Sequence, residues 1–148
     1  MPPRTILVVD DQHGVCVSLA YFLELAGYRV LTAESGPSAV ALAEKEVIDG
    51  AVIDVHMPVV NGFDTCLRLQ SQAGVTRREL RVWFMTGACT SELERRGVEL
   101  GALGVFRKPF DSPSFLEQLE HGFASARPEI QTVTEPIGSK GENDSTAW

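Results

Sequence analysis

The sequence has few cysteines and no long apolar run. Its three cysteines, Cys16, Cys66 and Cys89, contain no C-x-x-C pair, and an odd number cannot all pair within one chain. Three reduced thiols, as in a cytoplasmic protein, are therefore expected. No apolar segment reaches the roughly 18 residues of a membrane span. The first four residues lead straight into a strand-like segment, so no signal peptide is predicted.

Basic residues are also scarce. The 148 residues include 13 Lys and Arg against 20 Asp and Glu, a formal net charge of −7. This excess of negative charge argues against nonspecific electrostatic binding to nucleic acid or to an anionic membrane, because both would be repelled. Hydrophobic residues make up 44% and charged residues 22% of the chain, a composition typical of a soluble globular protein. The length suggests one domain with a core of its own.

Short apolar segments alternate with longer amphipathic ones along most of the chain. Strands are expected over residues 5–9, 28–32, 51–54, 81–85 and 104–107. Five β-α units in succession predict an α/β fold, with a parallel sheet covered by helices on both faces. The crossovers must be right-handed, which leaves few topologies.

Helices are expected in the segments between and after these strands. The first carries an apolar stripe at helical spacing and stops at Gly27, and the last begins at Ser112-Pro113, interpreted as a cap and a first turn. The others are expected over residues 35–46, 63–74 and 91–100. After residue 126 all periodicity ends. A domain over residues 4–125 and a disordered tail over 126–148 are therefore predicted.

Charged and hydroxyl side chains follow the predicted strands. Asp10 and Asp11 follow the first strand, Asp54 ends the third, Thr86 follows the fourth, and Lys108 follows the fifth. In an open parallel sheet the carboxyl ends of the strands meet at one edge, where ligands bind. Three carboxylates, one hydroxyl and one ammonium are therefore expected in one pocket. A simpler interpretation of the first two acids is a helix N-cap.

The charges of these groups indicate their chemistry. Three neighbouring carboxylates repel one another and raise at least one pKa, and a hard divalent cation such as Mg²⁺ removes that conflict. Together with Lys108 the filled site is close to neutral, so a phosphoryl group can approach it. A carboxylate can then attack and form an aspartyl phosphate.

Four short motifs in this order resemble the receiver domain of two-component response regulators, of the stand-alone type. They are Asp10-Asp11, Asp54-x-x-Met57-Pro58-x-x-x-Gly62, Thr86-Gly87-Ala88 and Lys108-Pro109-Phe110. The resemblance covers about residues 4–125. It implies a flavodoxin-like (βα)5 three-layer sandwich with a parallel five-stranded sheet of order 2-1-3-4-5. It also implies a cytoplasmic protein that binds no nucleic acid directly.

The resemblance also assigns a role to each acid. Asp54 is implied to be the phosphoacceptor, taking a phosphoryl group from a sensor histidine kinase or a histidine phosphotransfer protein. Asp11 is implied to bind Mg²⁺ directly and Asp10 mainly through water. Asp54 and the backbone carbonyl of His56 complete the protein's share of the metal ligands, while the His56 side chain is expected to lie exposed beside the site.

The remaining motif residues are implied to respond to the phosphate. Lys108 is expected to pair with Asp54 at rest and with phosphate afterwards, and the Lys108–Pro109 bond is expected to be cis. Thr86 is expected to turn its hydroxyl towards the phosphate and to shift the loop before the fourth helix. The protein thus accepts a phosphoryl group on itself and is not predicted to be a turnover enzyme.

The sequence departs from the family at two places. Many receivers carry Tyr or Phe three residues before the lysine, where this chain has Val105. Phe106 follows one residue later and is expected to face the other side of the sheet. Output through the Thr86 loop and the fourth helix alone, or through a different surface, is therefore predicted. The resemblance also implies that the places of His56 and Ala88 tune dephosphorylation by positioning or excluding water. Because Ala88 has no group to orient water, self-dephosphorylation is expected to be slow to intermediate.

Several alternatives remain open. The first helix carries three additional apolar residues, Val17, Tyr21 and Leu25. They could contact the helical bundle of the kinase, they could form a weak dimer, or they could have neither use.

Three alternative functions are also considered. A degenerate receiver that binds a partner without being phosphorylated keeps the same fold. An aspartate-nucleophile phosphatase needs a second acid where His56 stands, and a flavin-binding module needs a phosphate loop where Asp10 and Asp11 stand.

Overall fold

A five-stranded parallel sheet forms the centre of the molecule. The computed structural model describes residues 3–76, 79–88, 90–109 and 111–124. Its strands are β1 (Thr5–Val9), β2 (Arg29–Ala33), β3 (Gly50–Asp54), β4 (Arg81–Thr86) and β5 (Gly104–Arg107). They lie in the order β2-β1-β3-β4-β5, and every pair is parallel. The predicted fold and strand order are confirmed. The expected tail, Cys89 and Phe110 lie outside the described residues.

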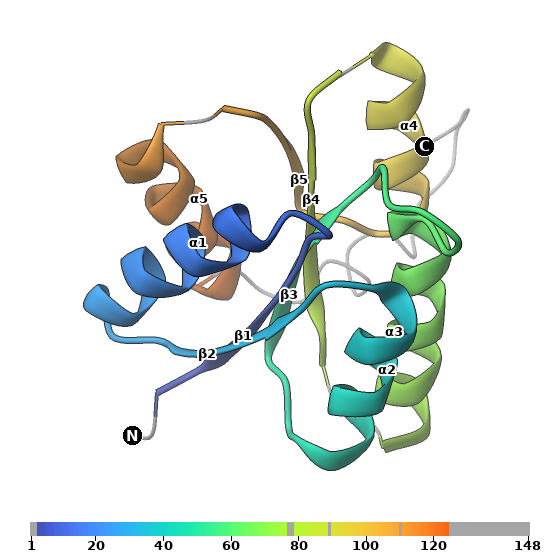
Figure 1. Cartoon of the computed structure of the whole chain (residues 1–148), viewed down its shortest axis with the longest axis horizontal. Helices are drawn as coiled ribbons and strands as arrows, with labels where there is room; N and C mark the ends of the chain where they lie inside the picture. Colours follow the sequence, from blue (N-terminus) through green and yellow to red (C-terminus); the bar gives the residue numbers. More distant parts are fainter. Residues whose placement is uncertain (1–2, 77–78, 89, 110, 125–148) are drawn as a thin grey trace.

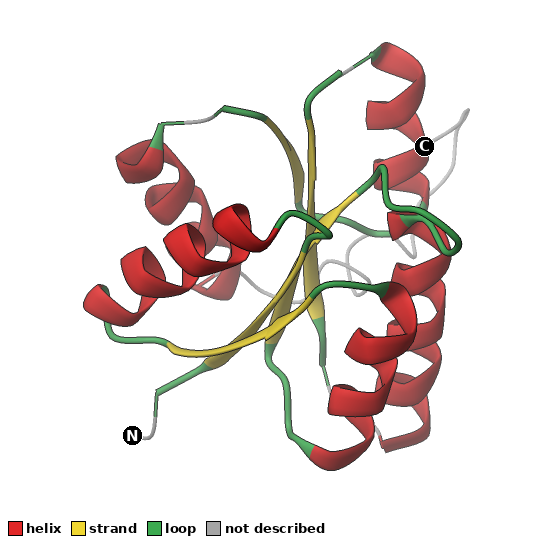
Figure 2. Cartoon of the chain, viewed as in Figure 1, coloured by secondary structure: helices red, strands yellow, loops and turns green. Residues whose placement is uncertain are grey.

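Helices cover both faces of this sheet (Figures 1 and 2). They are α1 (His13–Leu25), α2 (Gly36–Lys45), α3 (Gly62–Thr76), α4 (Ser91–Glu99) and α5 (Ser112–Ala124). In Figure 1, α1 and α5 lie on one side of the sheet, whereas α2, α3 and α4 lie on the other. Among the described residues, no helix has both the length and the hydropathy that crossing a membrane requires.

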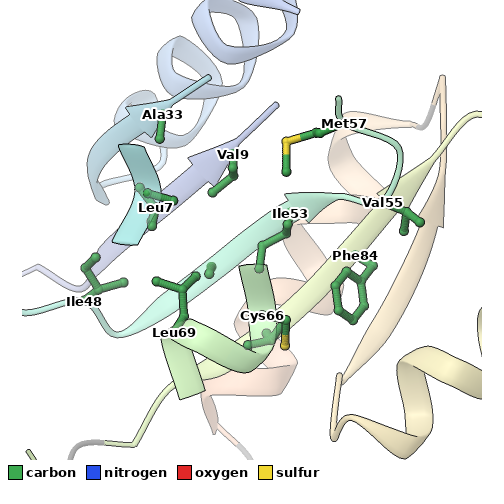
Figure 3. Packing of buried hydrophobic residues seen from close by; sticks show 13 residues of the cluster. Leu7, Val9, Ala33, Ile48, Ile53, Val55, Met57, Cys66, Leu69 and Phe84 are labelled. Carbon is green, nitrogen blue, oxygen red and sulfur yellow. The ribbon is translucent and has the colours of Figure 1, made fainter. Parts of the chain in front are cut away.

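Side-chain alternation along the strands divides the core into two layers. Leu7 and Val9 face α2 and α3, in a cluster with Ile53, Cys66 and Phe84 (Figure 3). The intervening residues of β1 face α1 and α5, in a cluster containing Ile6, Val8, Trp83, Phe115 and Leu119. Every residue of β1 and β3 is buried, as expected of central parallel strands covered on both faces.

The observed bounds differ from the predicted ones by at most two residues, and one strand start and one helix cap differ for visible local reasons. The N–H of Tyr28 donates to the carbonyl of Leu23 at 3.1 Å, and Gly27 has a φ of +102°. Tyr28 therefore belongs to the turn that ends α1, and β2 begins one residue later, at Arg29. At α5, the predicted cap Ser112 is wrong. The Asp111 carboxylate accepts from the N–H of Ser114 at 3.1 Å, so Asp111 is the cap.

Candidate functional site

Three carboxylates converge at the carboxyl ends of β1 and β3. One oxygen each of Asp10, Asp11 and Asp54 lies within 4.8 Å of the others. Asp10 is fully buried and Asp54 is 4% exposed, whereas Asp11 is exposed to solvent. The predicted convergence of these acids is confirmed. Their donor set consists of hard oxygen ligands and so suits a divalent cation such as Mg²⁺.

Lys108, which follows β5, adds a positive charge to this cluster. Its Nζ lies 2.7 Å from Asp10 Oδ2 and 3.4 Å from Asp54 Oδ1. The ion pair predicted with Asp54 is therefore present, but Asp10 is the nearer partner. The Lys108 N–H donates to the Thr86 carbonyl at 2.7 Å, and the Lys108–Pro109 bond is cis, as predicted. These contacts fix the lysine above the acids.

Asp10 is not the cap of α1, and both of its carboxylate oxygens accept hydrogen bonds from other groups. Its Oδ1 accepts from the N–H of Gln12 at 2.9 Å, while Oδ2 accepts from Lys108. The N-cap residue of α1 is Gln12 rather than either aspartate. With both oxygens engaged by protein donors, Asp10 is less available than Asp11 as a direct metal ligand, and its binding of Mg²⁺ through water stays a prediction.

The electrostatics of the site follow from this crowding. Burial, together with the charge of Asp10, raises the pKa of Asp54 from 3.8 to about 6, although Lys108 opposes the rise. Burial alone lowers the pKa of Lys108. The hydrogen bond to Asp10 and the charge of Asp54 outweigh it, so that this pKa lies above its ordinary value. At neutral pH the site therefore holds an Asp54 carboxylate whose charge is disfavoured by burial, beside the protonated amine of Lys108.

An open cavity of about 1010 Å³ lies above these groups. Asp54, Asp11 and Lys108 line it together with the uncharged side chains of Gln12 and Ser18. His56 also lines the cavity, and its side chain is exposed, as predicted. The cavity therefore connects the edge of the sheet at Asp54 with solvent.

Thr86 lies at the end of β4 and is fully buried. Its Oγ1 accepts from the N–H of Ala88 at 3.2 Å. Its position at the strand end agrees with the sequence, and its hydroxyl engages the first turn of the loop that leads to α4. The turn of this hydroxyl towards a phosphate stays a prediction.

The loop from β3 to α3 is tightly closed behind Asp54. The N–H of Gly62 donates to the Val55 carbonyl at 2.9 Å, and a Cβ at Gly62 would collide with the carbonyl of Asp54. Met57 anchors the loop by burying its side chain in the core cluster that contains Val9 and Ile53 (Figure 3). A glycine is therefore required where the chain passes so near the acidic cluster.

Val59, at the tip of this loop, has an unusual backbone. Its φ is +69°, and the N–H of Val60 donates to the Pro58 carbonyl at 2.8 Å, which closes a three-residue γ-turn. A β-branched residue in this region is strained. The Val59 side chain is 99% exposed, so that no packing offsets the strain.

Replacing Val59 with glycine is expected to raise the free energy of unfolding. Relief of a strained φ is worth ~1–3 kcal/mol, and the greater freedom of glycine in the unfolded chain removes ~0.5–1 kcal/mol of that gain. A net increase of about 1 kcal/mol should appear in urea unfolding. Val59→Ala, which keeps a Cβ, should gain less. A loss of stability in Val59→Gly would show that the valine makes a stabilising contact.

Val105 and Phe106 face opposite sides of β5, as predicted. Val105 packs against the core layer under α4, where its Cγ2 would lie 3.1 Å from a Cβ on Gly97. Phe106 packs in the other layer, with its ring centroid 4.7 Å from that of Phe115 in α5. The place where many receivers carry an aromatic ring thus holds a valine under a close-packed helix.

The additional apolar residues of α1 are exposed. Val17, Tyr21 and Leu25 are 52%, 66% and 71% exposed, and their spacing of four residues places them on one face of the helix. This face points away from the sheet, whereas Cys16, Leu19 and Leu23 are buried against it. The surface is available to a partner.

Sequence reasoning overlooked two features of the site. One is Gln12, whose Oε1 lies 3.5 Å from Lys108 Nζ. The sequence did offer a sign of this contact, because glutamine stands at the start of a helix, where the shorter side chains Ser, Thr, Asn and Asp are preferred as caps. The other is the strained turn at Val59, for which the sequence carries no signal, because valine is disfavoured there.

Fold and site together define a parallel α/β sandwich in which a buried aspartate lies beside a lysine within a cluster of three acids. Residues 6–120 match the response regulator receiver domain family. The chain belongs to this family and is a receiver domain homologous to two-component response regulators.

The chain is also similar in sequence to individual proteins of two-component systems. The sporulation initiation phosphotransferase F of Bacillus subtilis is 33% identical over 111 residues, which cover 75% of this chain and 86% of that protein. The alkaline phosphatase synthesis transcriptional regulatory protein PhoP of the same organism is 37% identical over 108 residues. The chain spans only 43% of the length of PhoP.

Solved structures show the same architecture. The non-phosphorylated HemR receiver domain of Leptospira biflexa superposes with a TM-score of 0.75 at 32% identity, covering 84% of this chain and 98% of that one. The chemotaxis protein CheY4 of Vibrio cholerae gives a TM-score of 0.71 at 33% identity, covering 80% of this chain and 98% of that one.

Proposed function

We propose that Asp54 accepts a phosphoryl group from a phosphohistidine of a sensor kinase or histidine phosphotransfer protein, and that the acyl phosphate switches a protein-interaction surface. The observation that supports this most strongly is the buried Asp54 carboxylate, 3.4 Å from Lys108 at the base of an open cavity. The phosphoacceptor would act in the cytoplasm, with residues 4–125 as its functional unit.

The acidic cluster is suited to Mg²⁺. Asp11, Asp54 and the backbone carbonyl of His56 would hold the ion directly, and Asp10 would hold it through water. Bound there, the ion supplies positive charge against the oxygens of the incoming phosphoryl group. The three acids offer the hard oxygen ligands that this ion prefers, and their mutual repulsion disfavours a site without a cation.

Transfer itself needs only a few groups of the chain. A carboxylate oxygen of Asp54 attacks phosphorus, the P–N bond of the donor breaks, and its electron pair returns to the donor imidazole, which takes up a proton from solvent. The ammonium group of Lys108 then pairs with the new phosphate in place of the Asp54 carboxylate, and the Thr86 hydroxyl binds the same phosphate. Hydrolysis later breaks the P–O bond to Asp54, leaving a carboxylate and inorganic phosphate.

The proposed donor meets the chain beside the cavity. The exposed face formed by Val17, Tyr21 and Leu25 lies on α1, the helix whose first turns line that cavity. An apolar helix face of this kind suits the helical bundle of a histidine kinase or phosphotransfer protein.

Signalling is proposed to run through Thr86 and α4. When Thr86 turns towards the phosphate, its contact with the Ala88 N–H is released, and the loop before α4 follows. Val105 cannot swing as an aromatic ring does, and Gly97 lets α4 approach it closely. Movement of α4 as a unit would therefore carry the output.

Incubation with Mg²⁺ and acetyl phosphate tests the proposed phosphoacceptor. Intact-protein mass spectrometry should show one labile phosphate on the wild type and none on Asp54→Asn. The decay of this species should be slow to intermediate, because Ala88 offers no group that orients water. Absence of phosphate on the wild type would favour a degenerate receiver, and labelling of Asp54→Asn would place the phosphate elsewhere.

A further inference from the structure

Gln12 starts α1 without capping it. It is the N-cap residue, with extended backbone angles (φ −91°, ψ 109°), and its side chain makes no capping hydrogen bond. The four other helices are capped by short side chains: Ser35, Asn61, Thr90 and Asp111 each accept from a helix N–H at 2.9 to 3.1 Å. Gln12 therefore occupies a place where Ser, Thr, Asn or Asp would stabilise the helix more.

The Gln12 side chain extends towards Lys108 instead. Lys108 Nζ has three N–H donors and three acceptors around it: Asp10 at 2.7 Å, Asp54 at 3.4 Å and Gln12 Oε1 at 3.5 Å. Gln12 is the uncharged one among these acceptors. It also lines the cavity above Asp54, so that its amide and the lysine share the space into which a phosphoryl group must fit.

We propose that Gln12 is a positioning residue that acts through Lys108, and this inference rests on the proposed phosphoryl transfer to Asp54. By accepting one N–H of the ammonium, the amide leaves the other two for Asp10 and for the phosphoryl oxygens. A neutral acceptor does this without adding a fourth carboxylate to the cluster. An asparagine, one methylene shorter, is a better cap but falls short of Lys108.

Two variants separate this role from helix stability. Gln12→Leu removes the acceptor at similar size, and Gln12→Asn removes the reach while adding a capping side chain. Phosphorylation by acetyl phosphate with Mg²⁺ should slow about five-fold in both, the effect of ~1 kcal/mol in a rate constant. The melting temperature should stay unchanged in Gln12→Leu and rise slightly in Gln12→Asn.

A spectroscopic signal reports on Lys108 directly. The chain has three lysines, Lys45, Lys108 and Lys140, so that the side-chain ammonium resonances in ¹H–¹⁵N NMR spectra can be assigned one by one. In metal-free protein, the Lys108 resonance should move in both variants while that of Lys45 stays fixed.

Unchanged phosphorylation rates in the variants, or slower rates with an unmoved Lys108 resonance, would overturn the positioning role while leaving Asp54 as phosphoacceptor. If the wild type is not phosphorylated at all, the proposed function fails and this inference falls with it.

Discussion

Replacing Asp54 by asparagine is expected to stabilise the metal-free protein at pH 7.5 by about 2 kcal/mol. Burial and the charge of Asp10 raise the pKa of Asp54 to about 6, so its ionised form is costly in the folded state. A pKa of about 6 instead of 3.8 corresponds to about 3 kcal/mol at neutral pH. Loss of the 3.4 Å contact with Lys108 offsets part of this gain.

The sign of the pH dependence is fixed by that raised pKa. Between about pH 4 and pH 6 the folded protein holds a proton on Asp54 that the unfolded chain has lost. Wild-type stability from this group is therefore greatest below pH 4 and decreases as pH rises through the window. The advantage of Asp54→Asn should accordingly shrink from pH 7 downwards and vanish near pH 4. Urea unfolding of the wild type and of Asp54→Asn across this pH range, in the presence of EDTA, measures the pH dependence of both proteins.

Two controls sharpen this experiment. Asp11→Asn removes a carboxylate from the same cluster, but because Asp11 is exposed its effect should stay within ~0.5 kcal/mol. Added Mg²⁺ should stabilise the wild type more than Asp54→Asn, since a ligand that binds the folded state raises its stability. A lower stability of Asp54→Asn at pH 7.5 without metal would mean that the ion pair with Lys108 outweighs the burial of the charge.

Gly62→Ala is expected to lower both stability and phosphorylation. The added Cβ would collide with the Asp54 carbonyl and lie 2.8 Å from the Cα of Val55. These are backbone atoms of the last residue of a central, buried strand and of the residue that follows it, so no side chain can rotate away. We expect a loss of about 3 kcal/mol in the free energy of unfolding. Displacement of Asp54 should also slow phosphorylation by acetyl phosphate.

Gly14→Ala provides the matched control. Gly14 lies in α1, where a Cβ would meet nothing within 4 Å. Because alanine favours a helix over glycine, its stability should be unchanged or higher by up to ~1 kcal/mol. Equal stability of Gly62→Ala and the wild type would show that the β3–α3 loop can relax without cost. If phosphorylation then also stays normal, the close passage of this loop does not position Asp54.

Much of the site followed from local sequence. Apolar, β-branched segments such as residues 5–9 and 51–54 define central strands, and the strand ends locate Asp10, Asp54 and Lys108. The predicted opposition of Val105 and Phe106 needed only the two-residue period of a strand. These features depend on short-range pattern and on the rule that parallel strands share an edge.

Other features needed the folded chain. Lys108 and Asp10 are 98 residues apart in sequence, and the preference of the lysine for Asp10 over Asp54 depends on angles and loop paths that no local pattern specifies. The positive φ of Val59 contradicts the propensity of valine, so that no local pattern indicates it.

The sequence by itself determined the sheet, its two apolar layers and the set of charged groups at one edge, because periodicity and burial are encoded residue by residue. The tertiary structure alone decided which acid holds the lysine, how deeply Asp54 is buried, and that Gln12 reaches across to Lys108. Those outcomes depend on distances between separate loops, and such distances exist only after the chain has packed.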